Sequence, residues 1–341
     1  MNFKPRLITS VAIAALVTIG LSLRAQSPPA GSQESAQTGN DSTLRVMLLG
    51  TRSGPAIDPQ RSGIGTLIVA GRERLLFDVG RGVPTAMSRM GIVPADVTKV
   101  FLTHLHSDHV IALPELYLFP WASQGRKTPF EVWGPVGTKA MMQHLQKAFA
   151  FDIRIRRDVD EKFPASGITA LATDIREGIV YQANGVTVTA FLVDHGPVKA
   201  AFGYRVDYRE RSVVLSGDTR PSENLVKFAK GADLLIHEVG ARSKQDPIFT
   251  GPPDELLPNS RATRGLVKRI LDHHTDPLEA GTIFGRVKPK LAVFSHYPGG
   301  AATILPLVRQ TYAGPLEVGE DGMTIDVGET VNIRRLPGAG S

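Results

Sequence analysis

The chain has 341 residues, 42% of them hydrophobic, with no cysteine and a formal net charge of +6. This length can bury a large core in one domain or at most two. The absence of cysteine excludes disulfides and thiolate metal sites, so any bound metal must be held by His, Asp or Glu.

The first 25 residues have the order of a secretory signal. Lys4 and Arg6 precede an apolar run over residues 7–23, and Ala25 stands at a suitable cleavage position. We therefore predict a signal peptide over residues 1–25 and a periplasmic or secreted protein that keeps no stable association with a membrane. The alternative is an uncleaved N-terminal segment that anchors the protein, although the apolar run is short for a span.

Outside this signal the charge is nearly balanced. Residues 1–25 contain three basic side chains and no acidic one, which leaves 36 basic and 33 acidic residues in the rest of the chain. Composition alone therefore gives little support for a nucleic-acid-binding protein. Segment 26–43 is polar and rich in Ser, Gln, Gly and Pro, so we predict a disordered linker there and a folded domain over residues 44–335.

Short runs of branched and aliphatic residues, typical of strands, recur along the predicted domain, with helical patterns between some of them. The helical patterns cover residues 137–150, 260–274 with Ser260 as N-cap, and 276–288 with Pro277 in the first turn. Strands in series in each half, with intervening helices, predict two facing sheets with helices outside, an α/β sandwich. The strand-like runs are 44–50, 65–71, 74–80, 99–104, 186–194, 202–208, 212–218, 233–239, 291–297 and a closing set within 315–334.

The stretch THLHSDH, from Thr103 to His109, follows a predicted strand and concentrates residues that bind metals. Neutral imidazoles and carboxylates suit zinc. In an extended loop His104 and His106 point the same way, whereas Asp108 and His109 turn toward a second position. The motif therefore predicts a site for two metals rather than one.

A site for two metals needs further ligands, and three apolar strands end in suitable residues. His195 ends TAFLVDH, Asp218 ends SVVLSGD and His296 ends LAVFSH. Each of these residues alone could be an ordinary turn residue. Together with the histidine-rich motif they make a complete ligand set for two metals.

Several segments, in the same order along the chain, resemble the metallo-β-lactamase fold superfamily of metallohydrolases, and most of all its ribonuclease Z and arylsulfatase-like branch. THLHSDH is typical of the superfamily, and the DHGPV and HHT segments point to this branch. The resemblance extends over nearly all of residues 44–335 and implies a four-layer αββα sandwich. The segments that carry it are LLGTRSGPAIDPQRSGIGTLI, LLFDVGRGV, THLHSDH, VDHGPVKAAFGYRVD, LSGDTR, LLIHEV, HHTDP and FSHY.

The resemblance also implies roles for individual residues. Two Zn2+ ions per chain are expected, with Asp218 bridging them and Asp78 supporting the first motif from outside. Asp108 and His274 are expected to be catalytic, His274 as a proton donor oriented by a third catalytic residue, Glu238. The motif around Glu238 matches the family's His-Glu-Ala-Thr only in part, because the Ala-Thr pair is replaced. One zinc ion is assigned to His104, His106 and His195, and the other to Asp108, His109 and His296.

Two zinc ions, two aspartates and one hydroxide leave a site with about one net positive charge. The resemblance therefore implies an exported zinc hydrolase that cleaves a small anionic ester, phosphodiester or aryl sulfate, with a metal-activated water. A ribonuclease Z-type endonuclease is the alternative, with nucleic acid the less favoured partner because an exported protein does not meet cytoplasmic tRNA. Further alternatives are a lactonase or β-lactamase of the same fold and a binding protein on a decayed hydrolase fold. For the oligomeric state, we consider a homodimer.

Overall fold

The computed structural model describes residues 43–258 and 260–336. The predicted signal peptide, and the predicted linker apart from Thr43, lie outside the described residues. Within the described ranges, no helix has both the length and the apolar character needed to cross a membrane.

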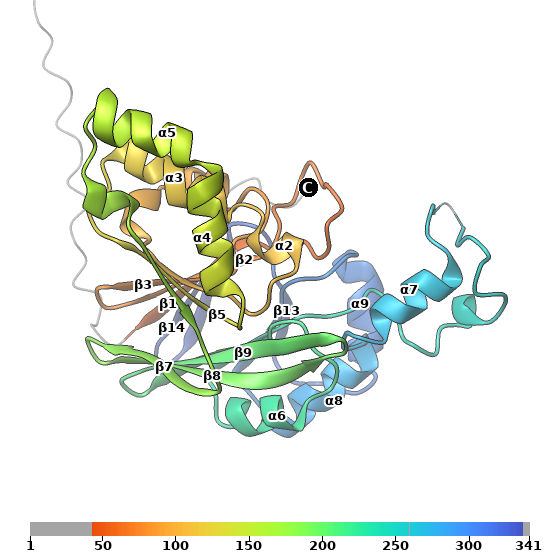
Figure 1. The fold of residues 1–341 in the computed structure, drawn as a ribbon. Helices are drawn as coiled ribbons and strands as arrows, with labels where there is room; N and C mark the ends of the chain where they lie inside the picture. The colour runs from red at the N-terminus through yellow and green to blue at the C-terminus, as the bar shows by residue number, and fades with distance from the viewer. Residues whose placement is uncertain (1–42, 259, 337–341) are drawn as a thin grey trace, which may run out of the picture. The chain divides into compact units, whose positions relative to one another are not determined.

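Two β-sheets form the centre of the domain (Figure 1). One has the strand order β15-β14-β1-β2-β3-β4-β5-β6, and the other has the order β13-β12-β11-β10-β9-β8-β7. Strands β3 to β6 pair in parallel, and so do β10 to β13. The strands are β1 (Leu44–Gly50), β2 (Gly65–Ala70), β3 (Glu73–Phe77), β4 (Lys99–Phe101), β5 (Phe130–Gly134), β6 (Ala170–Asp174), β7 (Gly178–Ala183), β8 (Val186–His195), β9 (Val198–Tyr208), β10 (Arg211–Leu215), β11 (Leu234–His237), β12 (Leu291–Phe294), β13 (Leu316–Val318), β14 (Thr324–Val327) and β15 (Val331–Arg334).

Helices cover the outer face of each sheet (Figure 1). The first sheet carries α1 (Val83–Arg89), α3 (Leu113–Gln124), α4 (Thr138–Ala148) and α5 (Ala150–Arg154), and the second carries α6 (Glu223–Ala229), α8 (Pro277–Val287) and α9 (Ala301–Val308). The remaining helical segments are α2 (Ser107–Val110), α7 (Arg264–Leu271), η1 (Pro94–Asp96), η2 (Ile155–Val159), η3 (Ala165–Ile168) and η4 (Pro247–Phe249).

Alternation of side chains along the strands produces these layers. In β1, Val46 and Leu48 join the core between the sheets, whereas Leu49 faces the helices of the first sheet. In β11, Ile236 joins the same central core, whereas Leu235 packs under the helices of the second sheet. Each sheet is therefore buried on both faces, which confirms the predicted four-layer αββα sandwich.

Parallel strands bring several strand ends to one edge of the sandwich. The carboxyl ends of β10, β11 and β12 lie side by side because these strands pair in parallel. Strand β8 runs in the same direction as β10, because both are antiparallel to β9. In the facing sheet, β3 and β4 also pair in parallel, so their carboxyl ends lie side by side. The residues at or just after these ends are Asp78, His104, His195, Asp218, Glu238 and His296.

The structure also corrects some expected boundaries. Ser260 as the N-cap of the predicted helix is wrong, because α7 begins later and its N-cap is Thr263, whose side chain accepts a hydrogen bond from Leu266 N. The residues before Thr263 fold back instead, and Arg264 N donates to the carbonyl of Glu255. The sequence patterns do not predict β5 to β7, or the helix α3, which carries Pro120 in its interior.

Candidate metal centre

Three imidazoles meet where the loop after β4 faces the end of β8. Nε2 of His104 lies 2.9 Å from Nδ1 of His106, and Nε2 of His195 lies 3.3 Å from the same atom. The three ligand atoms lie within 4.8 Å of one another, so they form one group that can hold a metal ion. His104 and His195 are buried, whereas His106 is exposed and forms the open side of the group.

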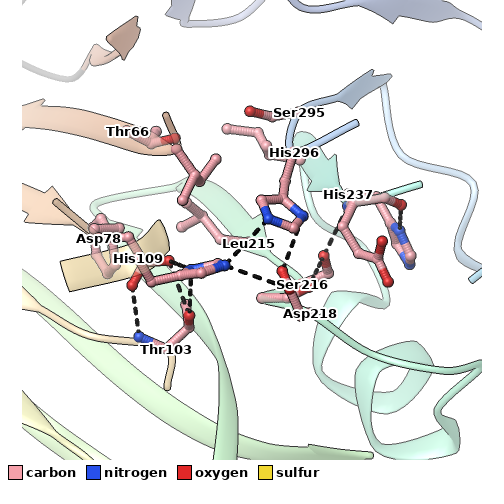
Figure 2. A pocket seen from close by; sticks show the side chains of 15 residues that line it. Thr66, Asp78, Thr103, His109, Leu215, Ser216, Asp218, His237, Ser295 and His296 are labelled. Carbon is pink, nitrogen blue, oxygen red and sulfur yellow. Dashed lines mark hydrogen bonds and ion pairs between the residues drawn. The ribbon is translucent and has the colours of Figure 1, made fainter. Parts of the chain in front are cut away.

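A second group, of Asp108, His109 and His296, lies beside the first. Figure 2 shows His109 and His296 of this group with Asp218. Nε2 of His296 lies 3.2 Å from Nε2 of His109 and 3.3 Å from Oδ2 of Asp108. The buried carboxylate of Asp218 stands between the groups, with Oδ2 3.4 Å from Nε2 of His109 and 3.9 Å from Nε2 of both His104 and His195. The structure therefore brings together all seven residues that the sequence singles out as metal ligands.

The donor chemistry of these residues fits a cation. His195 Nδ1 lies 3.1 Å from the carbonyl oxygen of His273, and His109 Nδ1 lies 2.8 Å from Asp78 Oδ2. Each of these contacts places a proton on Nδ1, so Nε2 presents a lone pair to the centre. Two further buried atoms there, Oδ1 of Asp218 and Nδ1 of His296, have no hydrogen bond although they lie 3.1 Å apart. Converging lone pairs and unpaired polar atoms are the arrangement that a metal ion satisfies.

Asp78, after β3, supports the first loop. Its Oδ1 accepts a hydrogen bond from Thr103 N at 2.9 Å, and its Oδ2 accepts from the Thr103 hydroxyl at 2.9 Å as well as contacting His109. The Thr103 hydroxyl lies 3.1 Å from His104 Nδ1, so it connects the supporting carboxylate to the other buried histidine of the loop. Figure 2 shows Asp78 and Thr103 beside His109, on the side away from His296. This is the outer support that metal-binding histidines usually need.

The buried Glu238 and the half-buried His274 form a pair beside the metal ligands. Glu238 Oε2 lies 3.0 Å from His274 Nδ1, and its Oε1 accepts hydrogen bonds from Thr275 N at 3.0 Å and Thr219 N at 3.2 Å. The His274 ring lies 5.0 Å from that of His195. Burial alone would lower the pKa of His274, but the Glu238 carboxylate outweighs burial and raises it to about 9. A proton donor is therefore present beside the ligands at neutral pH.

The protonation states in the centre match metal binding at Asp218, His104 and His195 but not at His109. Burial would lower the pKa of His109, but Asp218 and Asp78 outweigh burial and raise it well above its ordinary value, so His109 releases a proton when it binds an ion. Burial would raise the pKa of Asp218, but the neighbouring His296 and His109 lower it well below its ordinary value. Burial lowers the pKa of His104 and of His195, which keeps these imidazoles neutral. Ionised carboxylates and neutral imidazoles are the protonation states that bind zinc.

Some residues of the site are evident only in the folded structure. Gly54 N donates to Oδ2 of Asp108 at 2.9 Å from a loop 54 residues earlier in the chain. Thr219 and Thr275 hold Glu238, and the Thr275 hydroxyl donates to the Thr219 carbonyl at 2.7 Å. Thr103 directly precedes His104, so it is the one member of this set that a closer examination of the motif could have found.

Comparison with known proteins finds a matching family profile and several relatives of this chain. A profile of the beta-lactamase superfamily domain matches residues 73–297. Ribonuclease Z of Mycobacterium bovis is 33% identical over 293 residues, which cover 83% of this chain and 98% of that protein. Ribonuclease Z of Mycobacterium avium is 34% identical over 290 residues, which cover 82% and 96%.

Solved structures have the same fold at lower identity. The metallo-beta-lactamase fold protein YhfI from Bacillus subtilis superposes with a TM-score of 0.63 at 20% identity, covering 83% of this chain and 99% of that one. The short form of human tRNase Z superposes with a TM-score of 0.60 at 21% identity, covering 83% and 99%. These likenesses establish the architecture of the chain.

Proposed function

The chain belongs to the β-lactamase superfamily of metallohydrolases, in its ribonuclease Z branch, and from this membership we propose that it is a zinc-dependent endonuclease that hydrolyses phosphodiester bonds in RNA. The observation that carries the proposal is the identity to ribonuclease Z over almost the whole length of those relatives, together with seven converging metal-ligand residues. These relatives favour the ribonuclease alternative over a small anionic ester as the substrate.

In the proposed reaction, some residues of the site hold the metal ions and others supply a proton. His104, His106 and His195 would hold one zinc ion, Asp108, His109 and His296 would hold the other, and the Asp218 carboxylate lies within reach of both groups. When bound, zinc supplies Lewis acidity: it makes water a nucleophile near neutral pH and offsets negative charge on the phosphate. His274 donates a proton to the leaving oxygen, and Glu238 fixes the orientation of the imidazole and keeps it protonated.

A second candidate substrate class has a specific observation in its favour. The signal-like order of residues 1–25 favours an exported protein, and an exported member of this branch would meet small phosphodiesters or aryl sulfates rather than cytoplasmic RNA. The same ligands and the same proton donor serve either substrate, so the centre alone does not separate the two.

A substrate panel on the purified full-length protein tests the proposal. It compares a short single-stranded RNA, a precursor tRNA, bis(4-nitrophenyl) phosphate, 4-nitrophenyl sulfate, a lactone and a β-lactam, each with and without a chelator. We expect cleavage of the RNA substrates and of the bis-aryl phosphate, loss of activity with the chelator and recovery on adding zinc. Hydrolysis of any other substrate in the panel with both RNA substrates untouched contradicts the proposal, and cleavage of the bis-aryl phosphate or the sulfate in that case favours the second candidate.

A further inference from the structure

A pocket of about 260 Å³ opens beside the candidate ligand Asp108. Its walls come from the loop after β1, from the loop after β3 and from the α2 region. Arg52 and Arg81 line it together with apolar side chains, of which Ile57 is 81% and Ile111 58% exposed. The volume is near the lower end of ligand pockets, which suits one part of a larger substrate.

The loop that carries Arg52 is held in place. Gly54 N donates to Asp108, and Arg52 N donates to the Ser62 carbonyl at 3.0 Å. Arg61 stacks on the Tyr297 ring at 4.0 Å, and its guanidinium donates to the carbonyls of Thr51, Tyr297 and Gly299. Arg61 is therefore a structural residue that ties this loop to the segment after His296, and the pocket keeps a fixed position relative to the metal ligands.

Arg52 and Arg81, in contrast, keep donors available. Arg52 uses Nη1 on the Ser53 carbonyl at 2.8 Å and holds Nε 3.4 Å from Asp58 Oδ2. Arg81 uses only Nη2, on the carbonyls of Asp58 and Arg61, both at 2.7 Å. Within residues 43–258 and 260–336, Nη2 of Arg52 and both Nε and Nη1 of Arg81 have no hydrogen-bond partner.

Arg52 and Arg81 are the basic side chains that line this pocket, and Asp108 is the acidic one. Burial lowers the pKa of Arg52, the nearby guanidinium of Arg61 lowers it further, and Asp58 offsets this only in part. Crowded, half-buried guanidinium groups with free donors bind phosphate well, because it accepts two parallel hydrogen bonds and neutralises the charge.

We propose that Arg52 and Arg81 bind the phosphate next to the scissile one in an RNA strand, and that Ile57 and Ile111 contact the attached nucleoside. The inference rests on the proposed function, since it places the neighbouring nucleotide of the same substrate. It gives the enzyme a means to prefer a nucleotide chain over an isolated diester, because a compound with a single phosphate leaves this pocket empty.

The test compares Arg52→Gln and Arg81→Gln with the wild type on a short RNA and on bis(4-nitrophenyl) phosphate, which has one phosphate. We expect the ratio of kcat/KM for RNA to kcat/KM for the diester to fall about 10- to 100-fold, mainly through KM for RNA, as loss of a charged hydrogen bond predicts. The slope of log KM for RNA against log salt should fall by about 0.7 for the lost phosphate contact. Arg156→Gln is the matched control, because Arg156 lies outside the pocket lining and is paired with Asp152 at 2.9 Å and Glu161 at 2.7 Å.

Arg81 also donates to two backbone carbonyls, so Arg81→Gln can lose activity through a folding defect. Two further variants separate that effect from the loss of phosphate binding. Ile111→Asp places a negative charge in the pocket without removing either arginine, and Ile111→Asn is its neutral counterpart. The inference predicts that Asp raises KM for RNA far more than Asn does. An equal loss on both substrates, or an unchanged ratio in every variant, overturns the inference. A wild-type protein that cleaves neither substrate overturns the proposed function instead.

Discussion

The two halves of the candidate metal centre are built by different parts of the chain. The loop after β4 contributes four ligand residues within six positions, and Asp78 supports them through Thr103 and His109. The facing half takes its ligands from three separate strand ends, at His195, Asp218 and His296. The first half therefore takes its ligands from one contiguous loop, whereas the second half needs three separate strand ends to lie together.

Hydrogen bonds between loops hold this second half together. Arg220 N donates to the Asp194 carbonyl at 2.8 Å, and Arg220 Nε donates to the Asp272 carbonyl at 2.6 Å, which ties the turn that carries His195 to the segment that carries His274. Gly196 in this turn has φ +60°, and a Cβ there would lie 2.6 Å from His273 Cδ2. The second half therefore depends on contacts among several separate segments, whereas the ligands of the first half lie in one loop that Asp78 and Gly54 hold in place.

The largest expected effect comes from Asp218, which lies against ligand residues of both metal-binding groups. Asp218→Ala should abolish hydrolysis and weaken binding of both metal ions, because Asp218 lies against ligands of both groups. His106→Ala should also abolish hydrolysis but keep about one metal ion per chain, because His106 belongs to one group only. Elemental analysis after equilibrium dialysis and the phosphodiesterase rate measure these outcomes. His144→Ala, an exposed residue of α4, is the matched control and should change neither. Retention of both metal ions by Asp218→Ala would show that neither ligand group needs Asp218.

A smaller effect is expected from the proton donor in the second half. His274→Gln should keep the metal ions and lower turnover by about 100- to 10,000-fold on a poor leaving group, and less on 4-nitrophenolate. The pKa of His274 is raised to about 9, so the imidazole is protonated below that pH and activity should fall as pH rises through about 9. Glu238→Gln removes the carboxylate that raises this pKa, so the alkaline decline should move to lower pH. Turnover of His274→Gln equal to the wild type on every substrate would remove His274 from the mechanism.

The difference between one contiguous loop and several separate strand ends also explains which parts of the site could be predicted from the sequence. THLHSDH is contiguous, and apolar strands that end in His or Asp mark the other ligands, so parallel pairing of β10 to β12 is enough to bring Asp218 and His296 together. The contacts of Gly54 with Asp108 and of Thr275 with Glu238 depend on loop conformations across 54 and 37 residues. No local pattern in the sequence records such contacts, and the same is true of the pocket beside Asp108.

The smallest expected effect lies in the support of the first half. Asp78→Asn should keep the backbone, because Asp78 has φ 60° and Asn tolerates the left-handed region. The amide supplies one acceptor where the carboxylate receives hydrogen bonds from Thr103 N, the Thr103 hydroxyl and His109. Metal affinity, measured by competition with a chromophoric chelator, should fall about 10- to 100-fold, while activity at saturating zinc falls less. Asp158→Asn, an exposed carboxylate that pairs with Arg157 at 2.7 Å and belongs to neither ligand group, should leave the affinity unchanged. Asp78 contacts His109 directly and reaches His104 only through the Thr103 hydroxyl, so the ion held by His109 should be weakened most. Unchanged affinity for both ions would contradict the supporting role of Asp78.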